Sequence, residues 1–141
     1  MSSLNFETGI KTFDINGDQS KTVSFCPTDF NFIKRLYDAF VSVDALQEKY
    51  KAKISAELSP DEMMEIIVAT DGDVRSIIDT TFEAPVSDIV LGKLSAFAIA
   101  GGVPIWAGFL LAVMAECDEG FSTETTEINP KLQKVLGKYK K

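Results

Sequence analysis

The sequence predicts an α+β protein, in which an N-terminal β-hairpin of two or three strands precedes a mainly helical domain of four to six helices. Three observations carry this prediction. Apolar and polar residues alternate around a turn sequence in the first 25 residues, and apolar residues recur every three or four positions from residue 30 onward. A long stretch, residues 94–115, contains no charged residue. The 141 residues suffice for a single domain with its own core.

The hairpin is expected within residues 1–27. Phe13 and Ile15 alternate with polar residues, and Val23 and Phe25 repeat the alternation after NGDQS, a segment rich in turn-forming residues. Leu4–Phe6 is a candidate for a third strand. A two-stranded ribbon alone is marginal in water, so the hairpin should lean on the helices or pair with another chain's edge.

The clearest helix begins after Pro27, where Thr28 or Asp29 can cap its first N–H groups. Core packing is the main interpretation of its apolar face, and an exposed docking face is the alternative. That face is formed by eight residues: Phe30, Ile33, Leu36, Tyr37, Phe40, Val43, Tyr50 and Ile54.

A second helix is predicted from a capping box. Ser59 is the cap, Pro60 takes the first helical position and Glu62 follows three residues after the cap. Gly72 is a candidate interruption, because glycine costs about 1 kcal/mol relative to alanine inside a helix. The pattern stops near Pro85, and PVSDIVLGKL indicates one or two short turns.

The uncharged stretch is long enough to cross a bilayer. Two glycines and Pro104 in its middle would break a lipid-exposed helix, and its flanks lack the positive-inside pattern of charges. We therefore expect no membrane association. The preferred interpretation is a short helix at Leu94–Ala100, a turn at Gly101–Gly102, and a new helix that starts at Pro104.

The helix after Pro104 is apolar at nearly every position from Ile105 to Ala115. A helix that is hydrophobic all round is buried in the core, or one of its faces is covered by a second chain. We therefore expect a homo-oligomer. The candidate partner-binding residues, from this helix and the first long one, are Trp106, Phe109, Leu110, Phe40 and Tyr37.

The predicted domain spans residues 1–141, with a helical core at 28–128 and a basic C-terminal helix or tail at 129–141. After Gly120 the polar run reads as loop or frayed helix, and Asn129 and Pro130 are suited to start a last helix. The tail contains no acid, and its basic residues are Lys131, Lys134, Lys138, Lys140 and Lys141. These lysines either stabilise the negative end of the helix dipole or dock on an acidic neighbour, such as another copy of the chain.

The composition offers little for catalysis. The chain has no histidine, which removes the commonest general base and the usual transition-metal ligand. Asp14, Asn16, Asp18 and Ser20 have the alternate spacing of a calcium loop, but glycine and glutamate are missing from the two places where that loop needs them. We therefore expect no catalytic residue, no metal site and no cofactor.

Charge and cysteine usage limit the partners and the compartment. The formal net charge of −7 argues against nucleic acid as the principal partner. Cys26 and Cys117 lie far apart beside apolar neighbours, as free buried cysteines do, and the N-terminus lacks the pattern of a secretory signal. A reducing, cytoplasmic setting is expected.

Four stretches carry a family resemblance: TFDINGDQSKTVSFCPTDFNFIKRLYDAF, PVSDIVLG, VPIWAGFLLAVMAECDEG and NPKLQKVLGKYKK. Together they resemble a family of small proteins encoded by phages and prophages of Gram-positive bacteria, proteins that are similar to tail assembly chaperones. The family pattern has a hairpin ending in F-N-P-T-D, a long helix, a G-x-P-V-x-D turn and a P-x-W-A-N-F-L-L-A-V helix. This chain departs from it at Cys26 and Gly108, where the family has Asn, and is less typical over Ser55–Asp73.

The resemblance implies a non-enzymatic protein in the cytoplasm of the bacterial host. Its partner would be a tape-measure or other tail protein, whose apolar helices it would shield before the tail tube forms. No functional residue is carried over from the family. The alternatives are an anti-defence or host-takeover factor that sequesters a small molecule or host protein, and a minor structural protein of the virion.

Overall fold

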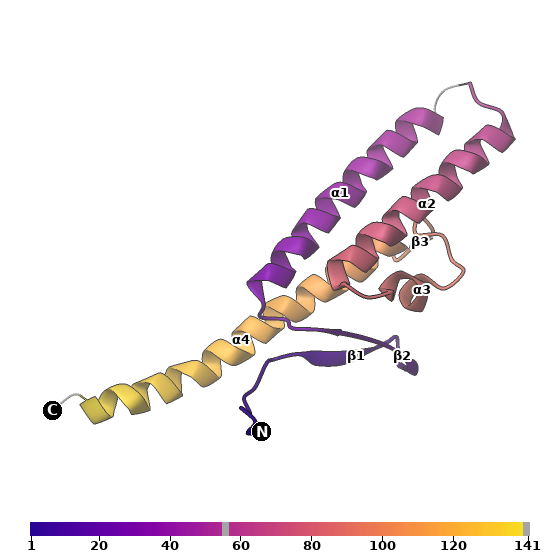
Figure 1. Cartoon of the computed structure of the whole chain (residues 1–141). Helices are drawn as coiled ribbons and strands as arrows, with labels where there is room; N and C mark the ends of the chain where they lie inside the picture. The colour runs from indigo at the N-terminus through magenta and orange to yellow at the C-terminus, as the bar shows by residue number, and fades with distance from the viewer. Residues whose placement is uncertain (55–56, 140–141) are drawn as a thin grey trace.

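The computed structural model of the chain describes residues 1–54 and 57–139, with side chains as far as residue 123. A two-stranded antiparallel hairpin precedes four helices, which confirms the predicted α+β class (Figure 1). In chain order the elements are β1 (Lys11–Ile15), β2 (Asp18–Phe25), α1 (Phe30–Ile54), α2 (Pro60–Phe82), α3 (Val86–Leu91), β3 (Ile99–Ala100), β4 (Val103–Pro104) and α4 (Ile105–Tyr139).

The two long helices α1 and α2 pack side by side as an antiparallel pair (Figure 1). The first turns of α4 pack against this pair, and its later turns extend past the rest of the chain toward the C-terminus (Figure 1). The β-hairpin lies alongside α4 near the start of α1, and β2 contacts α3. The hairpin and the helices therefore enclose one continuous core.

The hairpin forms where the alternation predicted it. Phe13 faces Val23 across the strands, and Asn16 and Gly17 form the turn with positive φ angles of 53° and 82°. The Asp14 carboxylate accepts a hydrogen bond of 3.0 Å from the Gly17 N–H, which holds this turn. Leu4–Phe6 forms no strand, so the suggestion of a third strand is wrong for the isolated chain.

Both predicted helix starts are confirmed. The Asp29 carboxylate accepts a 2.9 Å hydrogen bond from the Asn31 N–H at the start of α1. The Ser59 hydroxyl accepts from the Glu62 N–H at 3.2 Å and donates to the Glu62 carboxylate at 3.1 Å. The first of these bonds is the N-cap bond that the predicted capping box requires, and it satisfies an N–H group at the start of α2.

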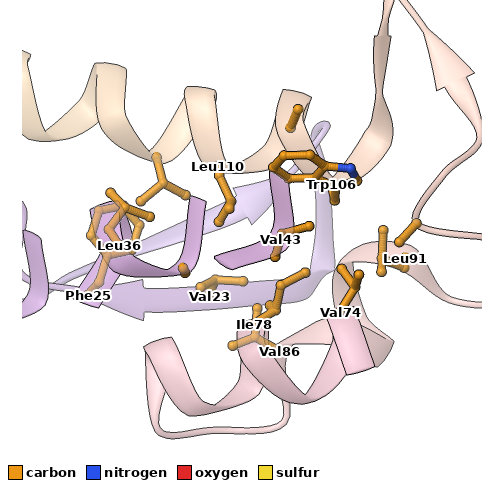
Figure 2. Close-up of a cluster of buried hydrophobic side chains, with 14 of the residues drawn as sticks. Val23, Phe25, Leu36, Val43, Val74, Ile78, Val86, Leu91, Trp106 and Leu110 are labelled. Atoms are coloured by element: carbon orange, nitrogen blue, oxygen red, sulfur yellow. The ribbon is translucent and has the colours of Figure 1, made fainter. Parts of the chain in front are cut away.

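The core is assembled from β2 and all four helices. Figure 2 shows Val23 and Phe25 of the hairpin meeting Leu36 and Val43 of α1, with Leu110 of α4 packed over them. The remaining labelled side chains come from α2, α3 and α4, namely Val74, Ile78, Val86, Leu91 and Trp106. Phe25 stacks on both Phe13 and Phe32, with ring centroids 4.6 and 5.1 Å away.

Gly72 does not interrupt α2, which is continuous from Pro60 to Phe82. The helix holds because the residues around the glycine are fixed by tertiary contacts. Asp71 pairs with Arg75 one turn later, at 2.9 Å between Nε and Oδ2, and the other Asp71 oxygen accepts from the Ala96 N–H at 2.6 Å. These contacts outweigh the cost of glycine inside the helix.

The helix expected at Leu94–Ala100 is absent, and this prediction is wrong. Ile99–Ala100 and Val103–Pro104 instead pair as a minimal hairpin around Gly101 and Gly102, whose φ angles are 63° and 83°. The turn at the two glycines is therefore confirmed, and α4 starts at Ile105, directly after Pro104. The preceding loop is not helical because its backbone groups bond to α2: Arg75 donates to the carbonyl oxygens of Gly92 and Leu94 at 2.9 and 2.8 Å.

The polar run after Gly120, predicted as loop or frayed helix, is helical, and the prediction that a last helix starts anew at Asn129 is wrong. A single helix, α4, runs from Ile105 to Tyr139. Gly120 is not a helix end but a contact point, because a Cβ atom there would lie 2.7 Å from the Pro27 Cβ. Glycine lets α4 approach the loop before α1 at close range.

Within the described residues, no helix combines the length and the apolarity that crossing a bilayer requires. The first turns of α4 are apolar, but charged residues begin at Glu116. The uncharged stretch is instead divided between the α3–α4 connection and the part of α4 that packs on the core.

Candidate protein-binding surface

One side of α4 completes the core. Trp106, Leu110, Val113 and Cys117 follow one another at three- and four-residue spacing and are all buried. The Trp106 indole donates a 2.8 Å hydrogen bond to the Gln47 side-chain oxygen and meets the Phe40 ring edge-on at 5.2 Å. The polar N–H group of the single tryptophan is therefore hydrogen-bonded within the protein, and its ring is buried.

The opposite side of α4 faces solvent and is also apolar. Gly108, Leu111, Ala112 and Ala115 share this side, and Leu111 keeps 46 % of its surface exposed. We call these four residues the outer face of α4. The exposed acids Asp118 and Glu119 continue it by one further turn. A helix with an apolar outer face and an acidic continuation is suited to contact another protein.

A shallow groove borders the outer face on the side of α1. We call it the α1/α4 groove; its walls are Phe30, Ile33, Leu36 and Tyr37 from α1, and Met114, Cys117, Asp118 and Phe121 from α4. The Phe30 ring of α1 contacts the Phe121 ring of α4, with 5.2 Å between the ring centroids. Phe30, Tyr37 and the neighbouring Val41 are 75 %, 55 % and 68 % exposed, so large apolar side chains here contact water.

A larger hollow borders the outer face on the side of the β-hairpin. This hairpin/α4 cavity has a volume of about 470 Å³. Its apolar lining comes from the hairpin, α3, the α3–α4 connection and α4, and includes Phe13, Ile15, Val90, Leu94, Ile105 and Phe109. Asp14, Asn16 and Glu116 supply the polar groups of its lining. α4 thus presents an exposed apolar face between two apolar hollows.

The candidate partner-binding residues predicted from the sequence lie in different places. Trp106 and Leu110 are core residues with 2 % and 0 % exposure, so in the folded chain they are not available to a partner. Phe40 and Phe109 are partly buried, and Phe109 lines the hairpin/α4 cavity. Tyr37 alone of the five is exposed, in the wall of the α1/α4 groove. The tail lysines from Lys131 to Lys141 fall outside the side chains that the structure describes.

The exposed residues Leu111 and Val41 were missed by the sequence reasoning. The uncharged run marked the first turns of α4 as apolar on every side, but it did not indicate which side the core takes. On α1, the buried residues are Phe32, Leu36, Ala39 and Val43, so the core-facing stripe is rotated from the predicted one. A signal was present in Phe30, Tyr37 and Val41, which recur on one helix face beside the core stripe.

The described part of the chain offers no group of three or more His, Cys, Asp or Glu residues that could hold a metal ion. Cys26 and Cys117 are both free. Burial, with the nearby Asp118 carboxylate, raises the pKa of the Cys117 thiol to about 11. Such a thiol is protonated at neutral pH and is a poor nucleophile.

Comparison with models of known protein families, with curated proteins and with solved structures finds no match to this chain.

Proposed function

We propose that this protein is a non-enzymatic phage or prophage assembly protein, a tail assembly chaperone that shields the apolar helices of a tape-measure-like partner. The observation that carries the proposal is the outer face of α4, which is exposed and apolar and continues into the α1/α4 groove. The resemblance of the sequence motifs supplies the biological setting, the cytoplasm of the bacterial host.

The shape of the surface supports a helical partner. Gly108, Ala112 and Ala115 have small side chains, so the axis of a second helix can approach α4 closely. Leu111, Tyr37 and Phe30 stand beside them as larger contacts, in the arrangement that receives an amphipathic helix. The α1/α4 groove has a volume of about 110 Å³, so one apolar side chain of the partner would enter it while its neighbours pack on the outer face.

The charge around the surface supports a partner with basic flanks. Asp118 and Glu119 follow the outer face on α4, and Asp118 also lines the α1/α4 groove. The preferred partner is therefore an amphipathic helix that carries Lys or Arg one turn beyond its apolar stripe, and complementary charge speeds association with it.

The proposal is tested by co-expressing the chain with the tape-measure protein encoded nearest to it. The wild type should keep the tape-measure protein soluble and co-purify with it. The double variant Tyr37→Ser/Leu111→Asp should lose at least ten-fold in affinity, because a charge is placed on the apolar face and an aromatic contact is removed. Circular dichroism of the variant should match the wild type, since both side chains are exposed.

Val68→Asp is the matched control. Val68 is 65 % exposed on α2 and lines neither the α1/α4 groove nor the hairpin/α4 cavity, so its substitution should leave binding unchanged. Equal loss of binding in both variants would contradict the proposed surface. Failure of the wild type to bind any part of the tape-measure protein would contradict the proposed function.

The hairpin/α4 cavity favours a second candidate, an anti-defence or host-takeover factor that sequesters a small molecule. Its volume of about 470 Å³ lies in the range of small-ligand pockets, about 300–1,000 Å³. Native mass spectrometry of the protein purified from infected cells separates the two candidates, because a bound small molecule would add a discrete mass. A minor virion component, the third candidate, would remain in purified particles, from which a chaperone is absent.

A further inference from the structure

The N-terminal arm, residues 1–10, is the most exposed apolar segment in the described part of the chain. Leu4, Phe6 and Ile10 keep 91 %, 78 % and 63 % of their surface exposed, and the arm belongs to no helix or strand. Three large apolar side chains in water within seven residues are costly to leave uncovered. Leu4 and Phe6 stand two residues apart, the spacing that puts both on one side of a strand.

A second unpartnered feature lies along β1. This strand pairs only with β2, so within the described residues its other edge has no strand beside it. An open edge presents a row of free N–H and C=O groups that can accept a further strand. The same part of the hairpin, Phe13 to Asn16, forms one wall of the hairpin/α4 cavity.

The arm cannot reach this edge of its own β1 without losing its anchor. Its root is held beside β2, because the Cys26 thiol donates to the Thr8 carbonyl oxygen at 3.5 Å. Gly9 packs against the same sulfur: a Cβ atom there would lie 3.1 Å from Sγ. The anchor stands at the end of the hairpin opposite to its turn, and the arm leaves the hairpin there (Figure 1). A fold-back along β1 would need a reversal at Gly9 and Ile10 that pulls Thr8 off Cys26.

We propose that two copies of the chain exchange their N-terminal arms. The arm of one copy adds to the open edge of β1 in the other, and Leu4 and Phe6 cover the hairpin/α4 cavity. The lengths agree: with Leu4 opposite Ile15 and Phe6 opposite Phe13, both arm side chains lie on the cavity side of the strand, and an extended chain spans about 14 Å from Thr8 back to Leu4 as it does from Lys11 to Ile15. The exchange is reciprocal: in a dimer with one two-fold axis, each arm pairs with the β1 edge of the other copy, so both arms are covered and both edges are paired.

The area is sufficient for a specific dimer. Three apolar side chains from each arm, with the surfaces that they cover, remove on the order of 1,000 Å² from water, the lower limit for such interfaces. The strand hydrogen bonds add to this contact. The dimer leaves the α1/α4 groove uncovered, but the covered cavity is lined by Gly108 and Ala112 of the outer face, so the exchanged arm and a tape-measure helix compete for these two positions.

Light scattering after size-exclusion chromatography tests the exchange. The wild type should have the mass of a dimer, and Phe6→Asp should have the mass of a monomer with unchanged circular dichroism, because the arm carries no part of the core. Met64→Asp, at a 56 % exposed position on α2, is the matched control and should stay dimeric. A monomeric wild type at the highest attainable concentration, or a dimeric Phe6→Asp variant, would overturn the proposal.

A disulfide experiment locates the arm. The background is Cys117→Ala with Cys26→Ser, whose hydroxyl keeps a donor for the Thr8 carbonyl oxygen and so preserves the anchor. In this background a chain with Phe6→Cys is mixed with a chain that carries Ala112→Cys, at the cavity wall. Mild oxidation should give a covalent heterodimer in several-fold excess over the homodimer of either chain. A chain with both substitutions that closes only an internal disulfide would show that the arm covers its own cavity, and this result would overturn the exchange. Both results concern the position of the arm, and binding of a tape-measure helix is tested separately by the Tyr37→Ser/Leu111→Asp variant.

Discussion

Arg75 and Asp71 on α2 position the connection between α3 and α4. Arg75 bonds to Asp71, to Asp88 at 3.0 Å and to two backbone carbonyl oxygens, while its side chain is only 19 % exposed. The flat guanidinium can serve four acceptors at once, which a lysine ammonium cannot do in the same geometry. The connection then leads into the minimal hairpin from which α4 starts. Two side chains thus set the direction of the helix that carries the proposed binding face.

The first prediction concerns this network. Arg75→Lys should lower the free energy of unfolding by about 2–3 kcal/mol, because the shielded Asp71 carboxylate and a carbonyl oxygen lose donors. Lys34→Ala, which removes the exposed Lys34–Asp38 pair, should cost no more than about 0.5 kcal/mol. Urea unfolding followed by the fluorescence of Trp106 measures both values. Equal midpoints for Arg75→Lys and the wild type would show that the network does not hold the connection.

The second prediction concerns the pKa of Cys117. In a Cys26→Ser background, Cys117 should fail to react with a thiol reagent at pH 8 in the folded protein and react at once in urea. The rate in the folded state should rise as the pH approaches about 11. Because the folded-state pKa lies above the ordinary value of 9.0, the protonated thiol favours folding below about pH 9. That contribution should decline between about pH 9 and 11. Fast modification at pH 8 without urea would contradict the burial of the thiol.

At the scale of elements, the sequence predicts the helices and strands that depend on neighbouring residues, and it does not predict those that depend on contacts with distant residues. The hairpin and the starts of α1, α2 and α4 follow from alternation, caps and proline, all of which act within a few residues. The sequence predicts a helix at Leu94–Ala100, because the hydrogen bonds that shape this loop come from Asp71 and Arg75, about twenty residues earlier, and leave no local signal. The role of Gly120 has no local signal, because its contact with Pro27 joins residues 93 positions apart.

The third prediction uses two glycines inside helices as a matched pair. Gly120→Ala should destabilise the fold by about 1–3 kcal/mol, because its Cβ would lie 2.7 Å from Pro27 Cβ, in a rigid ring. Gly72→Ala should instead stabilise the fold by about 0.5–1 kcal/mol, since nothing lies within 4 Å of that Cβ and alanine is the better helix former. Thermal unfolding of both variants measures the two signs. A stabilising Gly120→Ala would show that α4 does not approach Pro27 closely.

For the whole molecule, the organising feature is a helix that is apolar on two sides. The sequence predicted that α4 would be buried, completed by an oligomer, or both, but it could not separate its two faces. The structure separates them: the Trp106 side closes the core, and the Leu111 side is left between two apolar hollows. Of the predicted partner-binding residues, only Tyr37 is openly exposed, because aromatic size does not reveal on which side of a helix a core forms.

The central claim, that the molecule acts through this apolar surface, is tested most directly by calorimetric titration with a tape-measure peptide that carries one amphipathic helix. The wild type should bind with a negative heat-capacity change, because apolar surface leaves water on both partners. Leu111→Asp should weaken binding at least ten-fold, and Val68→Asp should leave it unchanged. Binding that is insensitive to Leu111→Asp, or that has no heat-capacity change, would contradict the account.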